Sequence, residues 1–141
     1  MEVNENNVTV EEKNIFFNSE TVNEFNFENF DYIIDAIDTV TSKLLLIEKA
    51  KEYNVPIISC MGTGGKTNPS LFEVTDIKKT HTCPLAKVMR KELKERGINS
   101  LKVVFSPEQP VKANDIIPSI SFVPSSAGLL IASEVIKDLI K

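Results

Sequence analysis

Apolar positions along the chain fall into short continuous runs that alternate with stretches of helical spacing. The runs at residues 32–37, 56–60 and 101–105 are rich in β-branched residues and too short for buried helices, so they predict strands. Residues 39–54 and 84–97 carry their apolar side chains at intervals of three and four, which predicts helices with one buried face. This alternation is typical of an α/β fold with a largely parallel sheet and flanking helices.

Weaker patterns predict the remaining elements. Ser125 or Ser126 is expected to cap a last helix that ends at Ile140. This helix is apolar on most of its circumference, so we expect it to be buried or to face a second copy of the chain. The other expected elements are short strands at residues 8–10, 15–17, 71–75 and 120–123, and a short helix capped by Ser19.

Two segments allow finer expectations. The run at 32–37 has one polar interruption, Asp35, so it predicts a central strand covered on both faces. Pro84 suits the first turn of the second helix, and Gly97 suits its end. The inner face of that helix is expected to comprise Leu85, Val88, Met89 and Leu93.

Composition is that of a single globular domain spanning residues 1–141, with 42% hydrophobic and 26% charged residues. The polar N-terminus does not look like a signal peptide, and no apolar run is long enough to cross a membrane. Two cysteines are too few for a disulfide framework. We therefore expect a cytoplasmic protein.

Charge is unevenly distributed around a net value of −4. Residues 1–40 carry ten acidic and one basic residue, whereas residues 78–96 carry seven basic and two acidic residues. The basic segment is either a solvated helix face or a local contact for a phosphate backbone, and the sequence leaves both alternatives open.

Asp38 directly follows the strand predicted at residues 32–37. Ligands of open α/β sheets bind beyond the carboxyl ends of such strands. Its carboxylate there can help to bind Mg²⁺. The alternative is that the side chain of Asp38 or of Thr39 merely caps the next helix. The glycine-rich loop at 61–69 fits neither a P-loop nor a dinucleotide fingerprint. It is therefore either a tight turn or part of a ligand pocket.

Cys83 precedes the helix that Pro84 opens, close to His81, the single histidine. A helix N-terminus favours the thiolate, so Cys83 is a candidate nucleophile; the alternative is a cysteine that packs or caps. Cys60 ends an apolar strand and is expected in the core.

Several segments together resemble the ubiquitin-activating-enzyme-like family of adenylating proteins, the ThiF/MoeB type. The central motif of that family is matched by residues 30–40 with Lys43. Residues 59–66, 84–86 and 119–129 look like the branch that dehydrates threonylcarbamoyladenosine in tRNA. The resemblance covers almost the whole chain.

The resemblance implies an ATP-dependent enzyme that adenylates the threonyl carboxylate of a modified adenosine in tRNA. Cyclisation then releases AMP. Asp38, Thr39 and Lys43 would belong to the nucleotide site, with Asp38 holding Mg²⁺. The family also implies a homodimer.

One departure from the family is large, because the N-terminal strand with its glycine-rich nucleotide loop is absent. We therefore expect residues 1–141 to be the C-terminal part of such a domain, with an incomplete Rossmann-like sheet and no catalytic activity in isolation. Cys83 lies in the region where relatives that load ubiquitin-like proteins carry a thioester cysteine. The alternatives are part of an activating enzyme for a ubiquitin-like sulfur carrier, and a non-catalytic dimerisation module.

Overall fold

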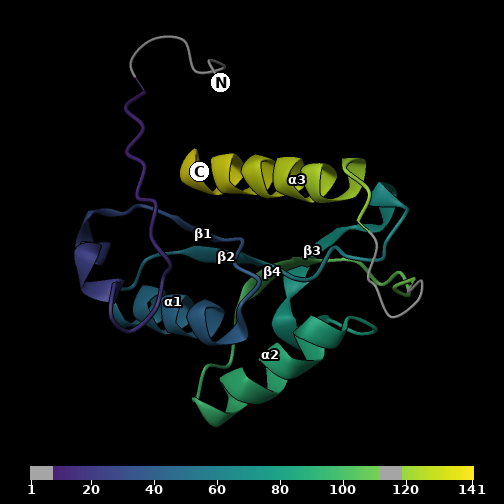
Figure 1. The fold of residues 1–141 in the computed structure, drawn as a ribbon, viewed down its shortest axis with the longest axis horizontal. Coiled ribbons are helices and arrows are strands. Elements are labelled where there is room, and N and C mark those ends of the chain that lie inside the picture. The colour runs from purple at the N-terminus through teal and green to yellow at the C-terminus, as the bar shows by residue number, and fades with distance from the viewer. Residues whose placement is uncertain (1–7, 112–118) are drawn as a thin grey trace.

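A four-stranded sheet lies between two layers of helices in the computed structural model, which describes residues 8–111 and 119–141 (Figure 1). The strand order is β1-β2-β4-β3. The first three of these strands are parallel, and β3 runs antiparallel to β4. The predicted α/β fold with a largely parallel sheet is therefore confirmed. The strands are β1 (Ile33–Asp35), β2 (Ile57–Cys60), β3 (Glu73–Asp76) and β4 (Lys102–Phe105).

Helices α1 (Val40–Glu52) and α2 (Pro84–Glu95) cover one face of the sheet, and α3 (Phe122–Leu139) covers the other (Figure 1). Pro84 occupies the first turn of α2, where its missing N–H costs nothing. Gly97 follows that helix with a φ of 71°, a left-handed conformation that glycine adopts without strain. Four short 3₁₀ helices complete the fold: η1 (Val22–Glu24), η2 (Phe27–Asn29), η3 (Pro69–Leu71) and η4 (Ile77–Lys79).

The core is divided by the sheet into two clusters of unequal size. The larger cluster packs α1 and α2 against the sheet through fully buried side chains such as Ile47, Met89 and Val103. The smaller cluster joins α3 to the sheet. Its buried members are Ile58, Val104, Ala127, Ile131 and Val135. The three from α3 are spaced at four-residue intervals, so a single stripe of this helix faces the sheet.

Strand β1 differs from its prediction, because it is covered on one face only. Ile33 and Asp35 are buried, whereas Ile34 between them is 49% exposed. In register, Ile34 lies beside Ile58 and so faces the α3 side of the sheet. Among the described residues, β1 pairs with β2 alone and forms an edge of the sheet. The prediction of a central strand covered on both faces is therefore wrong for the described residues.

The N-terminal predictions are wrong at three points. Residues 8–10 and 15–17 form no strands, and Val8, Val10 and Phe16 are exposed. Ser19 caps no helix; instead the Asn18 side chain accepts hydrogen bonds from two backbone N–H groups that follow it. Short β-rich runs need a neighbouring strand to pair with, and these have none among the described residues.

Two predictions about helices are also wrong. Helix α3 begins at Phe122, so residues 120–123 form no strand, and Ser125 and Ser126 lie inside the first turns. Their hydroxyls donate to the carbonyls four residues earlier instead of capping. On α2, Val88 is exposed because Ala86, Met89 and Leu93 define the buried face.

The outward face of α3 is apolar and exposed, so the helix is only half buried in this chain. Leu129 is 74% exposed. The exposed apolar side chains of this face are Phe122, Leu129, Ile136 and Ile140. No helix within 8–111 and 119–141 has both the length and the apolar character needed to cross a membrane. Residues 112–118, half of the proline-rich polar segment at 106–119, lie outside the described residues.

Candidate functional site

A cavity of about 230 Å³ opens where β1 and β2 end, between the sheet and the beginning of α3. Asp38 lines it from the β1–α1 loop, and Cys60, Met61 and Thr63 line it from the end of β2 and the loop that follows. Gly128 of α3 contributes to the opposite wall. This is the sheet end at which open α/β folds bind ligands, so Asp38 lies where the sequence places it.

The Asp38 carboxylate is exposed and makes no hydrogen bond or ion pair with a described residue. Thr39 occupies the N-cap position of α1, but its side chain makes no capping bond. The capping alternative for these two residues is therefore not observed. An unengaged carboxylate beside a cavity is available to a ligand or a cation.

Lys43 and Asp35 form a fully buried ion pair directly beneath the loop that carries Asp38. The Lys43 Nζ lies 2.9 Å from the Asp35 Oδ2, and both side chains are 0% exposed. Lys43 also donates to the Ile37 carbonyl at 2.9 Å, and Asp35 accepts from the Ile37 N–H at 3.0 Å. Because both members of the pair hold Ile37, they fix the backbone immediately before Asp38.

Ser59 completes this buried network and was not identified from the sequence. Its hydroxyl donates to the Asp35 Oδ2 at 2.5 Å from the neighbouring strand. The sequence did offer one indication, because Ser59 is a polar residue in an otherwise apolar strand. Strand register places it beside Asp35. All three polar side chains are satisfied, as buried polar groups need to be.

The glycine-rich loop after β2 is tightly folded, and it also reaches the cavity through Thr63. Lys66 is buried and donates to the carbonyls of Ser106 and Glu108, at 3.3 and 2.8 Å. The Glu108 carboxylate accepts hydrogen bonds from Thr67, which outweigh its partial desolvation and lower the pKa of Glu108. The two alternatives for this loop, a turn and a pocket wall, therefore both hold.

The two cysteines lie in different surroundings. Cys83 is 2% exposed at the N-cap of α2, packs in the larger core cluster, and makes no capping bond with its side chain. Cys60 is half-buried and lines the cavity, and burial raises the pKa of its thiol to about 11. Cys60 is therefore a neutral thiol at physiological pH, and Cys83 contributes to packing.

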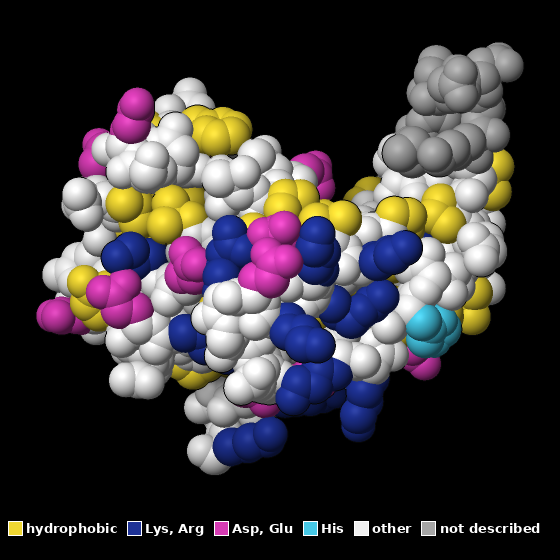
Figure 2. Space-filling model, turned by 90° about the horizontal axis from the view of Figure 1, so that it is seen from below, with side chains coloured by type: hydrophobic (Ala, Val, Ile, Leu, Met, Phe, Trp, Pro, Cys, Tyr) yellow, Lys and Arg dark blue, Asp and Glu magenta, His cyan; other side chains and the backbone are white. Residues whose placement is uncertain are grey.

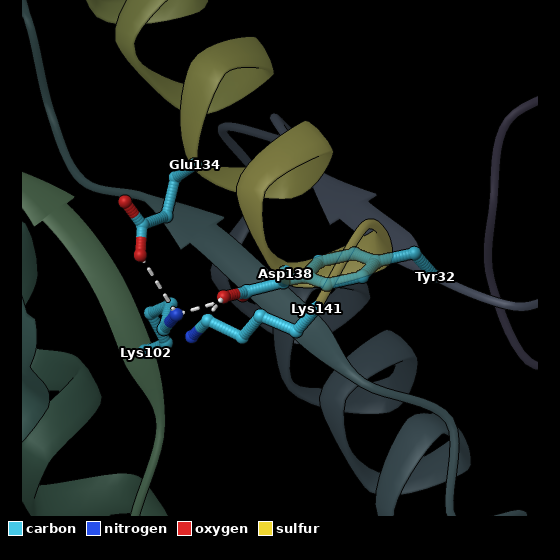
Figure 3. Close-up of polar contacts among 5 residues, drawn as sticks. All are labelled: Tyr32, Lys102, Glu134, Asp138 and Lys141. Atoms are coloured by element: carbon cyan, nitrogen blue, oxygen red, sulfur yellow. Dashed lines mark hydrogen bonds and ion pairs between the residues drawn. The ribbon is translucent and has the colours of Figure 1, made fainter.

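A second polar cluster ties α3 to the sheet and so positions one wall of the cavity (Figure 3). Lys102 of β4 lies 2.7 Å from the Asp138 carboxylate and 3.0 Å from that of Glu134. The Tyr32 hydroxyl donates to Asp138 at 2.7 Å. Hydrogen bonds from Lys102 and Tyr32 lower the pKa of Asp138 to about 2, while burial and the bond to Asp138 raise the pKa of Tyr32 to about 12.

The charge at the cavity is one-sided, because no lysine or arginine is among the described residues that line it. Lys43 lies beneath the Asp38 loop and Lys66 in the glycine-rich loop, but both are buried and engaged with carbonyl oxygens. The cavity thus offers the Asp38 carboxylate and the Thr63 hydroxyl without a compensating cation among its described lining residues. Such a site favours a divalent cation over a bare anion.

Sequence comparison places this arrangement among known proteins. The ThiF family model matches residues 2–141. The tRNA threonylcarbamoyladenosine dehydratase of Bacillus subtilis is 38% identical over 146 residues, which cover 90% of this chain and 58% of that protein. The protein of the same name from Escherichia coli is 36% identical over 101 residues, covering 66% of this chain and 38% of that protein.

Solved structures agree with the sequence relatives. The E. coli tRNA N6-threonylcarbamoyladenosine dehydratase, TcdA, superposes with a TM-score of 0.81 and 30% identity over 89% of this chain and 55% of that one. Its complex with ATP superposes with a TM-score of 0.78 and 30% identity, over 86% of this chain and 52% of that one. The chain spans little more than half the length of these proteins. On the match over residues 2–141 and the shared fold, the chain belongs to the ThiF family.

Proposed function

We propose that the chain is the C-terminal part of a tRNA threonylcarbamoyladenosine dehydratase. In this reaction the threonyl carboxylate of the modified adenosine is adenylated by ATP, and cyclisation then expels AMP with net loss of water. The observation that carries the proposal is the exposed Asp38 carboxylate at the carboxyl ends of β1 and β2, which has no partner among the described residues. The identity of 38% to the B. subtilis dehydratase supports the choice of reaction.

Mg·ATP fits the donor set at the cavity. Mg²⁺ is commonly bound by one or two carboxylates together with phosphate oxygens, and Asp38 supplies one such carboxylate. Thr39 follows Asp38 with an exposed hydroxyl that makes no capping bond. When bound, Mg²⁺ offsets the charge of the phosphates and orients them for attack. Complexes of TcdA with ATP and with AMP support nucleotide binding as part of the proposed function.

The chain supplies only one wall of this nucleotide site. The cavity of about 230 Å³ is smaller than the ~300–1,000 Å³ usual for small-molecule sites. No cation from the described lining residues faces the phosphates. We therefore expect the chain alone to bind Mg·ATP weakly and to show no ATP–pyrophosphate exchange.

The residues around Asp38 have separate roles in this proposal. Lys43 acts on the nucleotide indirectly, because its ammonium group is fully buried against Asp35 and the Ile37 carbonyl. It holds the loop so that Asp38 points away from the core. Tyr32 and Lys102 anchor α3 through Asp138 and so keep the opposite wall of the cavity in place.

The alternative function is activation of a ubiquitin-like sulfur carrier, and it would give Cys83 a covalent role. Cys83 is 2% exposed at the edge of a cavity of about 220 Å³, so little of its surface is open to a bulky acyl adenylate in this conformation. Burial therefore favours the dehydratase, in which the ring closes without an enzyme thioester.

We also propose a homodimer, formed through the exposed apolar face of α3. Leu129 lies at the centre of that face, opposite the stripe that packs on the sheet. A Leu129→Asp variant is expected to be monomeric by light scattering while the parent chain is dimeric. A dimer without any nucleotide binding would instead favour the non-catalytic dimerisation module.

The test of the proposed reaction is a chimera in which this chain replaces the matching region of the B. subtilis dehydratase. Nucleoside mass analysis of tRNA, from a strain that lacks its own enzyme, should show loss of one water from threonylcarbamoyladenosine. Asp38→Asn should abolish that loss, and Cys83→Ser should preserve it. A folded chimera that leaves the nucleoside intact, or that adenylates a sulfur-carrier protein instead, would refute the proposal.

A further inference from the structure

A strongly basic face covers α2 and η4 and takes no part in the site described above. Figure 2 shows its dark blue side chains gathered on the lower surface, beside the cyan histidine. We call this surface the basic face. Its members are Lys78, Lys79, Lys87, Arg90, Lys91 and Lys94.

The lysines of α2 form one stripe. Lys87, Lys91 and Lys94 are spaced at four and three residues, so they share one side of the helix over about 10 Å. All three are exposed, and none makes an ion pair with a described residue. Helix α2 carries two acids: Glu92 is engaged with Arg96 at 2.6 Å, and Glu95 is exposed at the C-terminal end of the stripe, four residues after Lys91. An ordinary solvated helix face mixes both signs of charge in similar numbers, whereas residues 78–96 carry seven basic and two acidic residues in a chain of net charge −4.

A hollow of about 350 Å³ lies within the basic face, with an apolar floor and cationic walls. Ile77 and Leu93 contribute to the floor, and Lys78 and Lys94 to the walls. Arg90, a further wall residue, is held in place because its guanidinium donates to the Thr80 carbonyl at 2.9 Å and to the Thr80 hydroxyl at 2.6 Å. A fixed guanidinium beside an apolar floor suits a sugar or base together with its phosphate.

The basic face begins next to the Asp38 cavity. Met61 lines that cavity, and a Cβ placed on the following residue, Gly62, would lie 3.8 Å from the Leu85 Cβ in the first turn of α2. From this turn α2 carries the lysine stripe away from the cavity. A long polyanion lying on the stripe therefore has one end close to the site of the proposed reaction.

We propose that the basic face binds the phosphate backbone of a tRNA and thereby delivers the modified adenosine to the Asp38 cavity. The choice of tRNA among RNAs rests on the proposed function. An anionic membrane is a weaker fit, because interfacial helices place a broad apolar face beside their cations, and Val88 is the one exposed large apolar residue of α2.

The test compares two variants of the 141-residue chain that carry the same net charge. In the first, three lysines of the basic face are replaced; in the second, three exposed lysines elsewhere. Each variant lowers the net charge from −4 to −7, so a difference between them reports position. The face variant is Lys87→Gln, Lys91→Gln and Lys94→Gln, and the control is Lys13→Gln, Lys51→Gln and Lys137→Gln.

Binding to unfractionated tRNA is measured by fluorescence anisotropy across a salt series. At about 0.1 M salt we expect the face variant to lose at least about tenfold in affinity and the control to change less than about twofold. Each phosphate contact contributes ~0.7–0.9 to the slope of log K against log salt, so the slope should fall by about 2 to 3. Equal losses in both variants, no tRNA binding by the parent chain, or tighter binding to phosphatidylserine vesicles than to tRNA would each overturn the proposal.

Titration of the face variant with Mg·ATP separates this proposal from the proposed function. Amide shifts around Asp38 should be unchanged in that variant, because none of its three lysines lines the cavity. If position-dependent tRNA binding is found while Mg·ATP leaves those amides unmoved, the RNA surface stands and the nucleotide site fails. The reverse outcome refutes the RNA surface alone.

Discussion

Replacing Lys43 by methionine should be among the most damaging single changes in the chain. Lys43→Met keeps most of the length of the side chain but leaves the Asp35 carboxylate buried without its counter-ion. The carboxylate would retain only the Ile37 N–H and the Ser59 hydroxyl as donors. The surrounding core offers no water-exposed route, since both members of the pair are 0% exposed.

The expected cost follows from that burial. Removing one partner of a buried ion pair destabilises a protein by about 3–5 kcal/mol, whereas replacing both partners by apolar groups is often close to neutral. With an m-value of about 2 kcal/mol/M, a loss of about 4 kcal/mol lowers the urea midpoint by about 2 M. The double variant Lys43→Met with Asp35→Leu should recover most of that loss.

Equilibrium urea unfolding of the two variants measures both effects. Lys49→Met is the matched control on the same helix, because the Lys49–Glu52 pair is as short, at 2.8 Å, but 28% and 56% exposed. The control should cost at most about 1 kcal/mol, as exposed pairs do. A loss of less than about 1 kcal/mol in Lys43→Met, or a double variant no more stable than the single, would refute the reasoning.

Two further predictions concern the backbone and the acid stability of the fold. Gly65→Ala should cost more than Gly97→Ala in urea unfolding: both glycines have a positive φ, but only at Gly65 would the new Cβ meet backbone atoms, at 2.7 and 2.9 Å. Equal costs would contradict this. Because the Lys102 ammonium lowers the pKa of Asp138 to about 2, this carboxylate contributes stability above pH ~4 that is lost as pH falls toward 2. Asp138→Asn should flatten that part of the stability profile, and an unchanged profile would count against the cluster.

The parts of the fold that could be predicted from the sequence are those with a clear local period. Helix α1 and strand β2 follow directly from apolar spacing, and Pro84 marks the start of α2. Strand β1 shows where prediction from local pattern fails. Its apolar run predicts a central strand, but the burial of Ile34 depends on neighbouring elements that no local pattern specifies.

The position of Asp38 could be predicted from the sequence, but the buried contacts among Lys43, Asp35 and Ser59 could not. Asp38 follows a strand, and topology alone brings it to the ligand-binding end of the sheet. The pairing of Lys43 with Asp35 and Ser59 depends on how α1 packs over β1 and on strand register, which spacing does not reveal. The resemblance placed Lys43 in the nucleotide site with Asp38 and Thr39, which stays a prediction, whereas the structure shows the Lys43 side chain fully buried against Asp35.

The most direct test of the account is a titration of the isotope-labelled chain with Mg·ATP, followed by amide chemical shifts. We expect weak, Mg²⁺-dependent shifts confined to residues 36–39 and 60–63 around the cavity. Asp38→Asn should remove the Mg²⁺ dependence, and Asp31→Asn, the same change at another exposed carboxylate, should preserve it. Shifts that persist unchanged in Asp38→Asn, or that appear away from this cavity, would contradict the assignment of the nucleotide site.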